Sequence, residues 1–134
     1  MKILIVDDMT SMRHVIYHML SDLGFTDVTE ASNGLKALEL LRAKKFELLI
    51  TDYHMPKLDG VQLLKHIRKD NELKLLPVLM VTCEDQRAEV QAIIEAKVNG
   101  FIIKPFTTNT LQNQLNKIQQ TCLAVQNKTY SNIA

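Results

Sequence analysis

Five short segments of this chain are predicted as strands, and longer stretches with helical periodicity separate them. They cover residues 2–6, 27–31, 48–51, 78–81 and 101–103, and all except 27–31 are apolar runs. Short apolar runs of this kind are typical of strands that are buried on both faces of a parallel sheet. Their alternation with helices predicts right-handed βαβ crossovers and helices on both sides of the sheet. We therefore expect an α/β fold with a doubly wound, five-stranded parallel sheet and five helices.

The helices are predicted from apolar spacing and from residues that begin or end a helix. Val15 and Leu20 belong to the apolar stripe of the first helix, which Gly24 ends. Asn33 and Gly34 open the second helix and Asp59 caps the third. The fourth helix is expected at about residues 85–97, and the fifth starts at Thr107.

Length and composition indicate one domain without a membrane or nucleic-acid partner. A chain of 134 residues is long enough for one hydrophobic core. The formal net charge of +1 gives no general attraction to nucleic acid or to an anionic membrane. Cys83 and Cys122 lack the spacing of a zinc site, and no apolar stretch reaches the length of a membrane span. We expect a cytoplasmic, monomeric protein. Residues 124–134 lack apolar periodicity, which predicts a flexible C-terminal tail.

Polar residues directly follow four of the five predicted strands. They are Asp7 and Asp8 after the first strand, Asp52 after the third, Thr82 after the fourth and Lys104 after the fifth. In open α/β sheets, ligands bind beyond the carboxyl ends of the strands. Three close carboxylates repel one another, and Mg²⁺ prefers such oxygen ligands. The set therefore predicts a site that binds Mg²⁺ and a phosphoryl group, in which one carboxylate can act as a nucleophile.

Simpler interpretations exist for each of these residues taken alone. An Asp-Asp pair after a strand is often only a helix cap. Asp52 alone fits a solvated loop carboxylate, Thr82 a strand-end residue and Lys104 a surface lysine. Their joint position after successive strands favours a single site.

These residues also carry a resemblance to a known family. The segments IVDDMTSMR, TDYHMPKLDG, LPVLMVT and KPFT resemble the receiver domain of two-component response regulators. Within that family the chain is most similar to single-domain, CheY-like chemotaxis regulators. The resemblance assigns residues 1–123 to the receiver domain. It implies the flavodoxin-like strand order 2-1-3-4-5.

The resemblance also implies roles for the site residues. Asp52 would be the phosphoacceptor, with Thr82 and Lys104 acting on the phosphoryl group. Mg²⁺ would be held by Asp7, Asp8, Asp52 and the backbone carbonyl of His54. Three further implications are a cis Lys104-Pro105 bond, Thr82 and Phe101 as switch residues, and His54 and Glu84 as residues that tune the rate of dephosphorylation.

The implied function is a phosphorylation-activated response regulator in a chemotaxis-like pathway. A histidine kinase would donate the phosphoryl group, and the fourth helix, fifth strand and fifth helix would bind an output protein. The chain would not be an enzyme beyond catalysing its own phosphorylation and dephosphorylation. Two alternatives are a phosphate sink without an output partner and a small Mg²⁺-dependent phosphatase. The length of 134 residues leaves no room for the cap domain that a phosphatase would use to select substrates.

Five residues depart from the chemotaxis pattern on the expected output face: Asp85, Ile94, Val98, Phe101 and Gln114. Ile94 and Val98 are bulky where the family has small alanines, and Phe101 lacks a tyrosine hydroxyl. A partner shaped for the usual face would meet clashes and lost polar contacts. Binding to the flagellar motor switch is therefore not expected.

Overall fold

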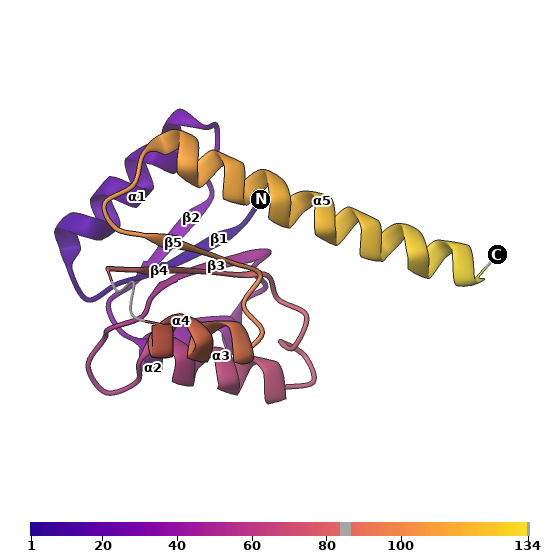
Figure 1. The fold of residues 1–134 in the computed structure, drawn as a ribbon, viewed down its shortest axis with the longest axis horizontal. Coiled ribbons are helices and arrows are strands. Elements are labelled where there is room, and N and C mark those ends of the chain that lie inside the picture. Colours follow the sequence, from indigo (N-terminus) through magenta and orange to yellow (C-terminus); the bar gives the residue numbers. More distant parts are fainter. Residues whose placement is uncertain (84–86, 134) are drawn as a thin grey trace.

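A computed structural model shows a three-layer α/β fold (Figure 1). It describes residues 1–83 and 87–133, apart from the side chains of residues 87, 88 and 122–133. The strands are β1 (Ile3–Val6), β2 (Val28–Ala31), β3 (Leu48–Asp52), β4 (Val78–Thr82) and β5 (Gly100–Ile103). The helices are α1 (Thr10–Asp22), α2 (Gly34–Ala43), α3 (Gly60–Lys69), α4 (Arg87–Glu95) and α5 (Thr108–Ile133).

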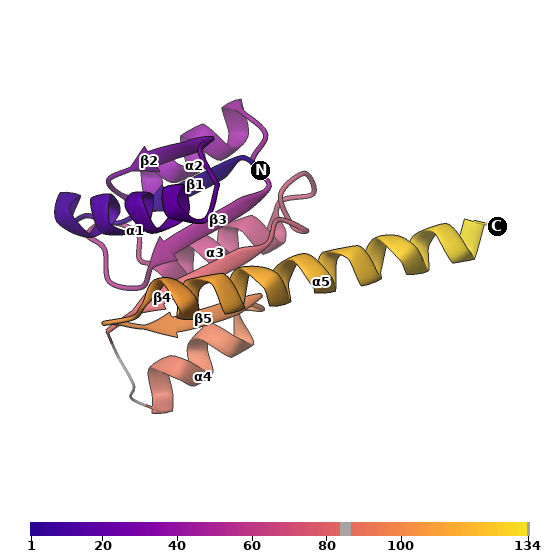
Figure 2. The ribbon, with the colours of Figure 1, turned by 90° about the horizontal axis from the view of Figure 1, so that it is seen from above.

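All five strands are parallel and lie in the order β2-β1-β3-β4-β5, which confirms the predicted sheet. Helices α1 and α5 cover one face of the sheet and α2, α3 and α4 cover the other (Figures 1 and 2). A separate hydrophobic core lies on each face. The apolar runs are continuous because the central strands bury side chains in both cores at once.

The helix starts at Asn33 and Asp59 have the expected side-chain caps. Asn33 Oδ1 accepts from the backbone N–H of Lys36 at 2.9 Å. Asp59 and Gln62 form a reciprocal capping box at the start of α3. This box fixes the end of the loop that connects β3 to α3, and that loop carries the residues directly after Asp52.

One local prediction needs correction, and the structure adds detail to another. Val15 is 43% exposed, whereas its neighbour Ile16 is buried. Successive helical residues point about 100° apart, so a stripe centred on Ile16 and Leu20 leaves Val15 at its edge. The segment predicted as a flexible tail from residue 124 is helical, because α5 continues through it to Ile133 and extends beyond the sheet (Figure 2). Its flexibility stays a prediction. No Gly or Pro lies between Thr108 and Ile133 to end the helix earlier.

The helices of the fold were compared with the requirements of a membrane span. Across the described ranges, no helix combines the length and the hydropathy that a membrane span requires.

Candidate functional site

The strand register brings the predicted polar residues to one edge of the sheet. Val6 pairs with Thr51, so Asp7 and Asp52 occupy the same level at the ends of neighbouring strands. Thr82 lies one residue beyond the partner of Asp52 on β4, and Lys104 lies one residue beyond the partner of Thr82 on β5. Each step corresponds to about 3.3 Å along a strand. The polar residues therefore lie next to one another across the ends of β1, β3, β4 and β5, and the position along the strand advances by one residue from β3 to β4 and again from β4 to β5.

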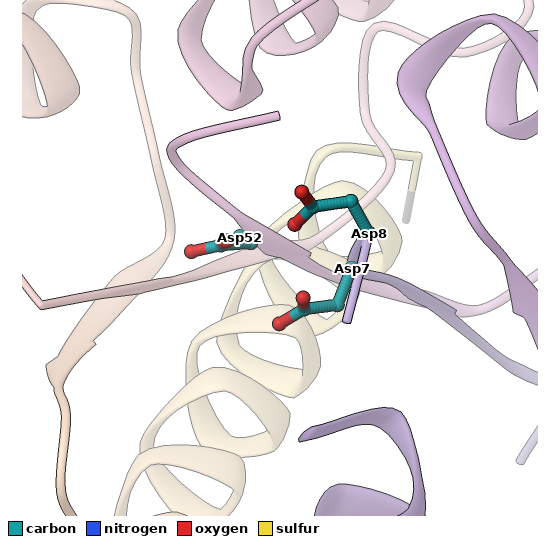
Figure 3. Close-up of side chains that lie close together, drawn as sticks. All are labelled: Asp7, Asp8 and Asp52. Atoms are coloured by element: carbon teal, nitrogen blue, oxygen red, sulfur yellow. The ribbon is translucent and has the colours of Figure 1, made fainter. Parts of the chain in front are cut away.

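Three carboxylates converge at this edge (Figure 3). Asp7, Asp8 and Asp52 each place an oxygen within 4.8 Å of the oxygens of the other two. Asp7 is 1% exposed and Asp52 is 8% exposed, whereas Asp8 lies at the surface. The close approach agrees with the prediction of a cation site, and all three donors are the hard oxygens that Mg²⁺ prefers.

The ammonium group of Lys104 bridges two of the carboxylates. Its Nζ lies 3.2 Å from Asp7 Oδ2 and 3.4 Å from Asp52 Oδ1. Burial lowers the pKa of Lys104, but the two carboxylates outweigh it, so the net shift is upward and the ammonium stays charged. Lys104 is therefore a fixed positive charge beside Asp52. The Lys104-Pro105 bond is cis, which confirms the conformation that the resemblance implied.

The carboxyl group of Asp52 is asymmetrically held. Its Oδ1 accepts from the backbone N–H of Tyr53 at 2.9 Å and faces Lys104. The described contacts thus gather on one oxygen, and they leave Oδ2 as the oxygen available to a new partner. Burial raises the pKa of Asp52; Lys104 opposes the shift and Asp7 adds to it, with a net rise above the usual value of 3.8.

Asp7 is oriented by its neighbours rather than by a capping role. Its Oδ1 accepts from the backbone N–H of Met9 at 2.9 Å, and its backbone carbonyl accepts from Arg13 Nη1 at 2.7 Å. The N-cap residue of α1 is Met9, which makes no side-chain cap. The interpretation of the Asp7-Asp8 pair as a helix cap is therefore not supported.

Arg13 was not predicted from the sequence. It lies on α1, donates to the Asp7 carbonyl, and places Nε 3.3 Å from Glu30 Oε1 on β2. Arg13 contacts the backbone carbonyl of Asp7 and the side chain of Glu30. No sequence motif relates Arg13 to these two groups, so the contacts could not be predicted. Arg13 ties the end of β1 to β2 and so fixes the direction in which Asp7 leaves the sheet.

Gly60 allows the chain to pass closely behind Asp52. A Cβ at this position would clash with the Asp52 carbonyl oxygen and would come 2.7 Å from Met80 Sδ. The Gly60 N–H also donates to the Tyr53 carbonyl at 2.8 Å. A side chain here would displace the acceptor strand, so Gly60 is required by packing.

Other predicted residues lie around the site. Thr82 is buried at the end of β4, and His54 is half-exposed on the loop after β3. Phe101 is partly buried against the core on the side of α3 and α4. Glu84 and Asp85 lie outside the described residues. The metal-binding carbonyl of His54 and the switch and rate-tuning roles remain predictions.

Comparisons with known proteins agree with this geometry. Residues 3–116 match the model of the response regulator receiver domain. The chemotaxis protein CheY-3 of Vibrio cholerae is 50% identical over 118 residues, which are 88% of this chain and 91% of that protein.

Two solved structures resemble the fold closely. The chemotaxis response regulator CheY4 of Vibrio cholerae has a TM-score of 0.80 and 32% identity, covering 87% of this chain and 97% of that one. The receiver domain of the sensor histidine kinase PA1611 from Pseudomonas aeruginosa has a TM-score of 0.79 and 26% identity, covering 88% and 97%. The latter structure has a magnesium ion coordinated in its active site cleft.

The raised pKa of Asp52 predicts a specific pH dependence of stability. Because the folded state holds the Asp52 proton more tightly than the unfolded state, the free energy of unfolding falls as pH rises from the usual value of 3.8 through the folded pKa. Asp52→Asn removes this loss. In EDTA, urea unfolding should therefore show the variant to be more stable than wild type at pH 7, with the difference shrinking as the pH falls towards 3.8. Asp27→Asn, at an exposed position, is the control, and equal stabilisation by both changes would contradict the interpretation.

Proposed function

The chain belongs to the response regulator receiver family as a CheY-like receiver domain of two-component signalling, and we propose that it is activated by phosphorylation of Asp52. The observation that carries this proposal is the position of Asp52 in a cluster of three carboxylates, where Lys104 Nζ lies 3.4 Å from Asp52 Oδ1. A carboxylate so placed has both a nucleophilic oxygen and a nearby positive charge for the group it attacks.

The described residues supply the parts of an in-line phosphoryl transfer. An oxygen of Asp52 forms the new bond to phosphorus, while the bond between phosphorus and the histidine nitrogen of the kinase breaks and its electron pair stays on that nitrogen. Lys104 binds a phosphoryl oxygen and offsets the charge that remains on the product. Thr82, at the end of β4, would donate its hydroxyl to another phosphoryl oxygen.

Asp7, Asp8, Asp52 and the backbone carbonyl of His54 would hold Mg²⁺ in this site. The oxygen donors fit this ion, because three carboxylates meet only one ammonium among the described residues. When bound, Mg²⁺ would offset part of the negative charge of the carboxylates and of the phosphoryl oxygens. The protein would then catalyse its own phosphorylation and dephosphorylation without acting as an enzyme on other substrates. We further propose that it is a monomer and that it acts in the cytoplasm.

This proposal predicts that acetyl phosphate phosphorylates wild type in the presence of Mg²⁺. Intact-mass analysis should show one phosphoryl adduct, and both EDTA and the Asp52→Asn change should abolish it. Asp59→Asn is a matched control, because asparagine caps a helix as well as aspartate does and the change lies outside the cluster. An adduct that persists in Asp52→Asn would show that another residue is the acceptor.

The output face favours a partner other than the usual motor protein, or no partner at all. Ile94 is 57% exposed on α4, and Phe101 presents no hydroxyl on β5. Gln114 on α5 lies against Gly100, where an added Cβ would come 2.7 Å from its Oε1. Bulky and neutral groups at this face would obstruct a partner that is shaped for alanines and a lysine. A phosphate sink therefore stays beside the switched output module as a candidate function.

We predict that a peptide from the flagellar motor switch binds weakly to this chain even after activation by beryllofluoride and Mg²⁺. The exposed Ile94 side chain is the expected obstacle, so Ile94→Ala should strengthen binding in a fluorescence titration. Leu35→Ala, at an exposed position on α2, should leave it unchanged. Tight binding by the activated wild type would show that this face is still adapted to the motor.

A further inference from the structure

The edge of the sheet opposite the acidic cluster carries a groove of about 1040 Å³. Residues at the starts of strands line it: Leu48 is the first residue of β3, and Pro77 and Asn99 directly precede β4 and β5. The loop between α3 and β4 borders the groove, as does α5, which continues past the strand starts (Figures 1 and 2). Four residues of β3 separate Leu48 from Asp52, a distance of roughly 13 Å, so the groove is separate from the acidic site.

Much of the groove is lined by apolar residues. They are Met1, Leu48, Leu75, Pro77, Leu115 and Ile118. Leu75 is 85% exposed, although it adjoins this apolar lining. A single exposed leucine is normal on a protein surface, but one that borders an apolar groove extends the area that a partner can cover. Covering this area would be favourable in proportion to the apolar surface that is removed from water.

Positive charge exceeds negative charge around the groove. Arg68, Lys74 and Lys97 line it, and Glu47 is the one acidic residue of the described lining. The Glu47 side chain is already engaged, because its Oε1 accepts from the backbone N–H of Lys2 at 3.0 Å. The three cations are therefore not matched by acidic groups of the groove itself.

Arg68 holds the backbone of the two lysines beside its own charge. Its Nε donates to the Lys97 carbonyl at 3.0 Å, and its Nη1 donates to the carbonyls of Lys74 at 3.1 Å and Leu76 at 2.7 Å. Nη2 donates to Asn99 Oδ1, so every acceptor is neutral, and no carboxylate in the part of the chain that the structure describes pairs with Arg68. Burial lowers the pKa of Arg68, although a guanidinium stays charged. An anionic partner would stabilise three cations that are gathered in this way.

Charge also distinguishes between the possible occupants of the groove. The part of α5 that extends beyond the sheet could reach the groove of a second copy, but residues 119–133 contain one charged residue, Lys128, and no acidic residue. This segment would add positive charge to a positive groove. A flat anionic membrane would meet the lysines but would leave the recessed apolar side chains uncovered. An occupant that enters the groove and carries carboxylates fits both properties.

We propose that this groove binds an amphipathic helix of a partner protein, whose apolar side chains cover Leu75 and Pro77 and whose glutamate or aspartate side chains face the three cations. Amphipathic helices bind apolar grooves through anchors spaced three, four and seven residues apart. Helix α5 gives such a helix a neighbour to pack against. The inference goes beyond phosphorylation of Asp52 and does not depend on it. A partner at this edge leaves the acidic cluster at the opposite edge accessible.

The test uses the full unphosphorylated chain and a synthetic helix of about 15 residues, with leucines on one face and glutamates flanking them. A matched peptide carries lysine in place of every glutamate. In ¹H–¹⁵N NMR titrations, we expect the glutamate peptide to shift the backbone amide resonances of Leu75, Lys97 and Asn99. The lysine peptide should leave these resonances unchanged, because it would bring positive charge to the groove.

Variants at exposed positions separate the two parts of the interaction. Leu75→Ser should weaken binding of the glutamate peptide by about tenfold, because it removes an apolar contact. Lys74→Gln and Lys97→Gln should each weaken binding by about two- to fivefold, the range of an exposed ion pair. The matched controls Leu35→Ser and Lys65→Gln change exposed residues outside the groove and should leave the affinity unchanged. Thermal unfolding checks that each variant is folded.

The absence of shifts at these amides, or equal binding of both peptides, would overturn the proposal. Two further measurements test the other occupants. Sedimentation that shows a dimer of the chain, which Leu75→Ser dissociates, would assign the groove to a second copy. Binding to phosphatidylglycerol vesicles that Lys74→Gln and Lys97→Gln weaken, and that Lys65→Gln does not, would assign this surface to a membrane. Either result would overturn the proposal of a partner helix.

Discussion

The structure depends on a concentration of negative charge at one edge of a parallel sheet. Asp7, Asp8 and Asp52 lie within 4.8 Å of one another, and Lys104 is the one ammonium that touches the cluster in the described part of the chain. Burial makes this arrangement unfavourable for the charged form of Asp52, as its raised pKa shows. Such a cluster would be stabilised by a ligand that is positively charged, or by one that brings positive charge with it.

The rest of the molecule holds this cluster in place. Strand register sets Asp7 level with Asp52, and Arg13 fixes the backbone carbonyl of Asp7 from α1. Gly60 lets the chain turn back closely behind Asp52. Glu89 Oε1 on α4 lies 3.8 Å from His54 Nε2, so α4 contacts the loop that follows Asp52.

Much of the fold could be predicted from the sequence. Strands that are buried on both faces appear as continuous apolar runs, and the starts of α2 and α3 are marked by the capping residues Asn33 and Asp59. The polar residues Asp7, Asp52, Thr82 and Lys104 were predictable because the carboxyl ends of parallel strands lie at one edge. The partners of Arg13, Glu89 and Arg68 were not predictable. Arg68 donates to the carbonyls of Lys74, Leu76 and Lys97, and such through-space contacts with backbone atoms leave no pattern along the chain. The continuation of α5 was missed because apolar periodicity reports packing, and a helix can extend past the sheet that it packs against.

The central claim, that the acidic cluster is built for a divalent cation, is tested most directly by the effect of Mg²⁺ on unfolding. A ligand that binds only the folded state raises the free energy of unfolding in proportion to the logarithm of its concentration above Kd. We predict that Mg²⁺ raises the unfolding temperature of wild type progressively, and that Asp7→Asn or Asp52→Asn removes most of this increase. The control Asp27→Asn should retain it. An unfolding temperature that does not respond to Mg²⁺, or that responds equally in all four proteins, would contradict the account.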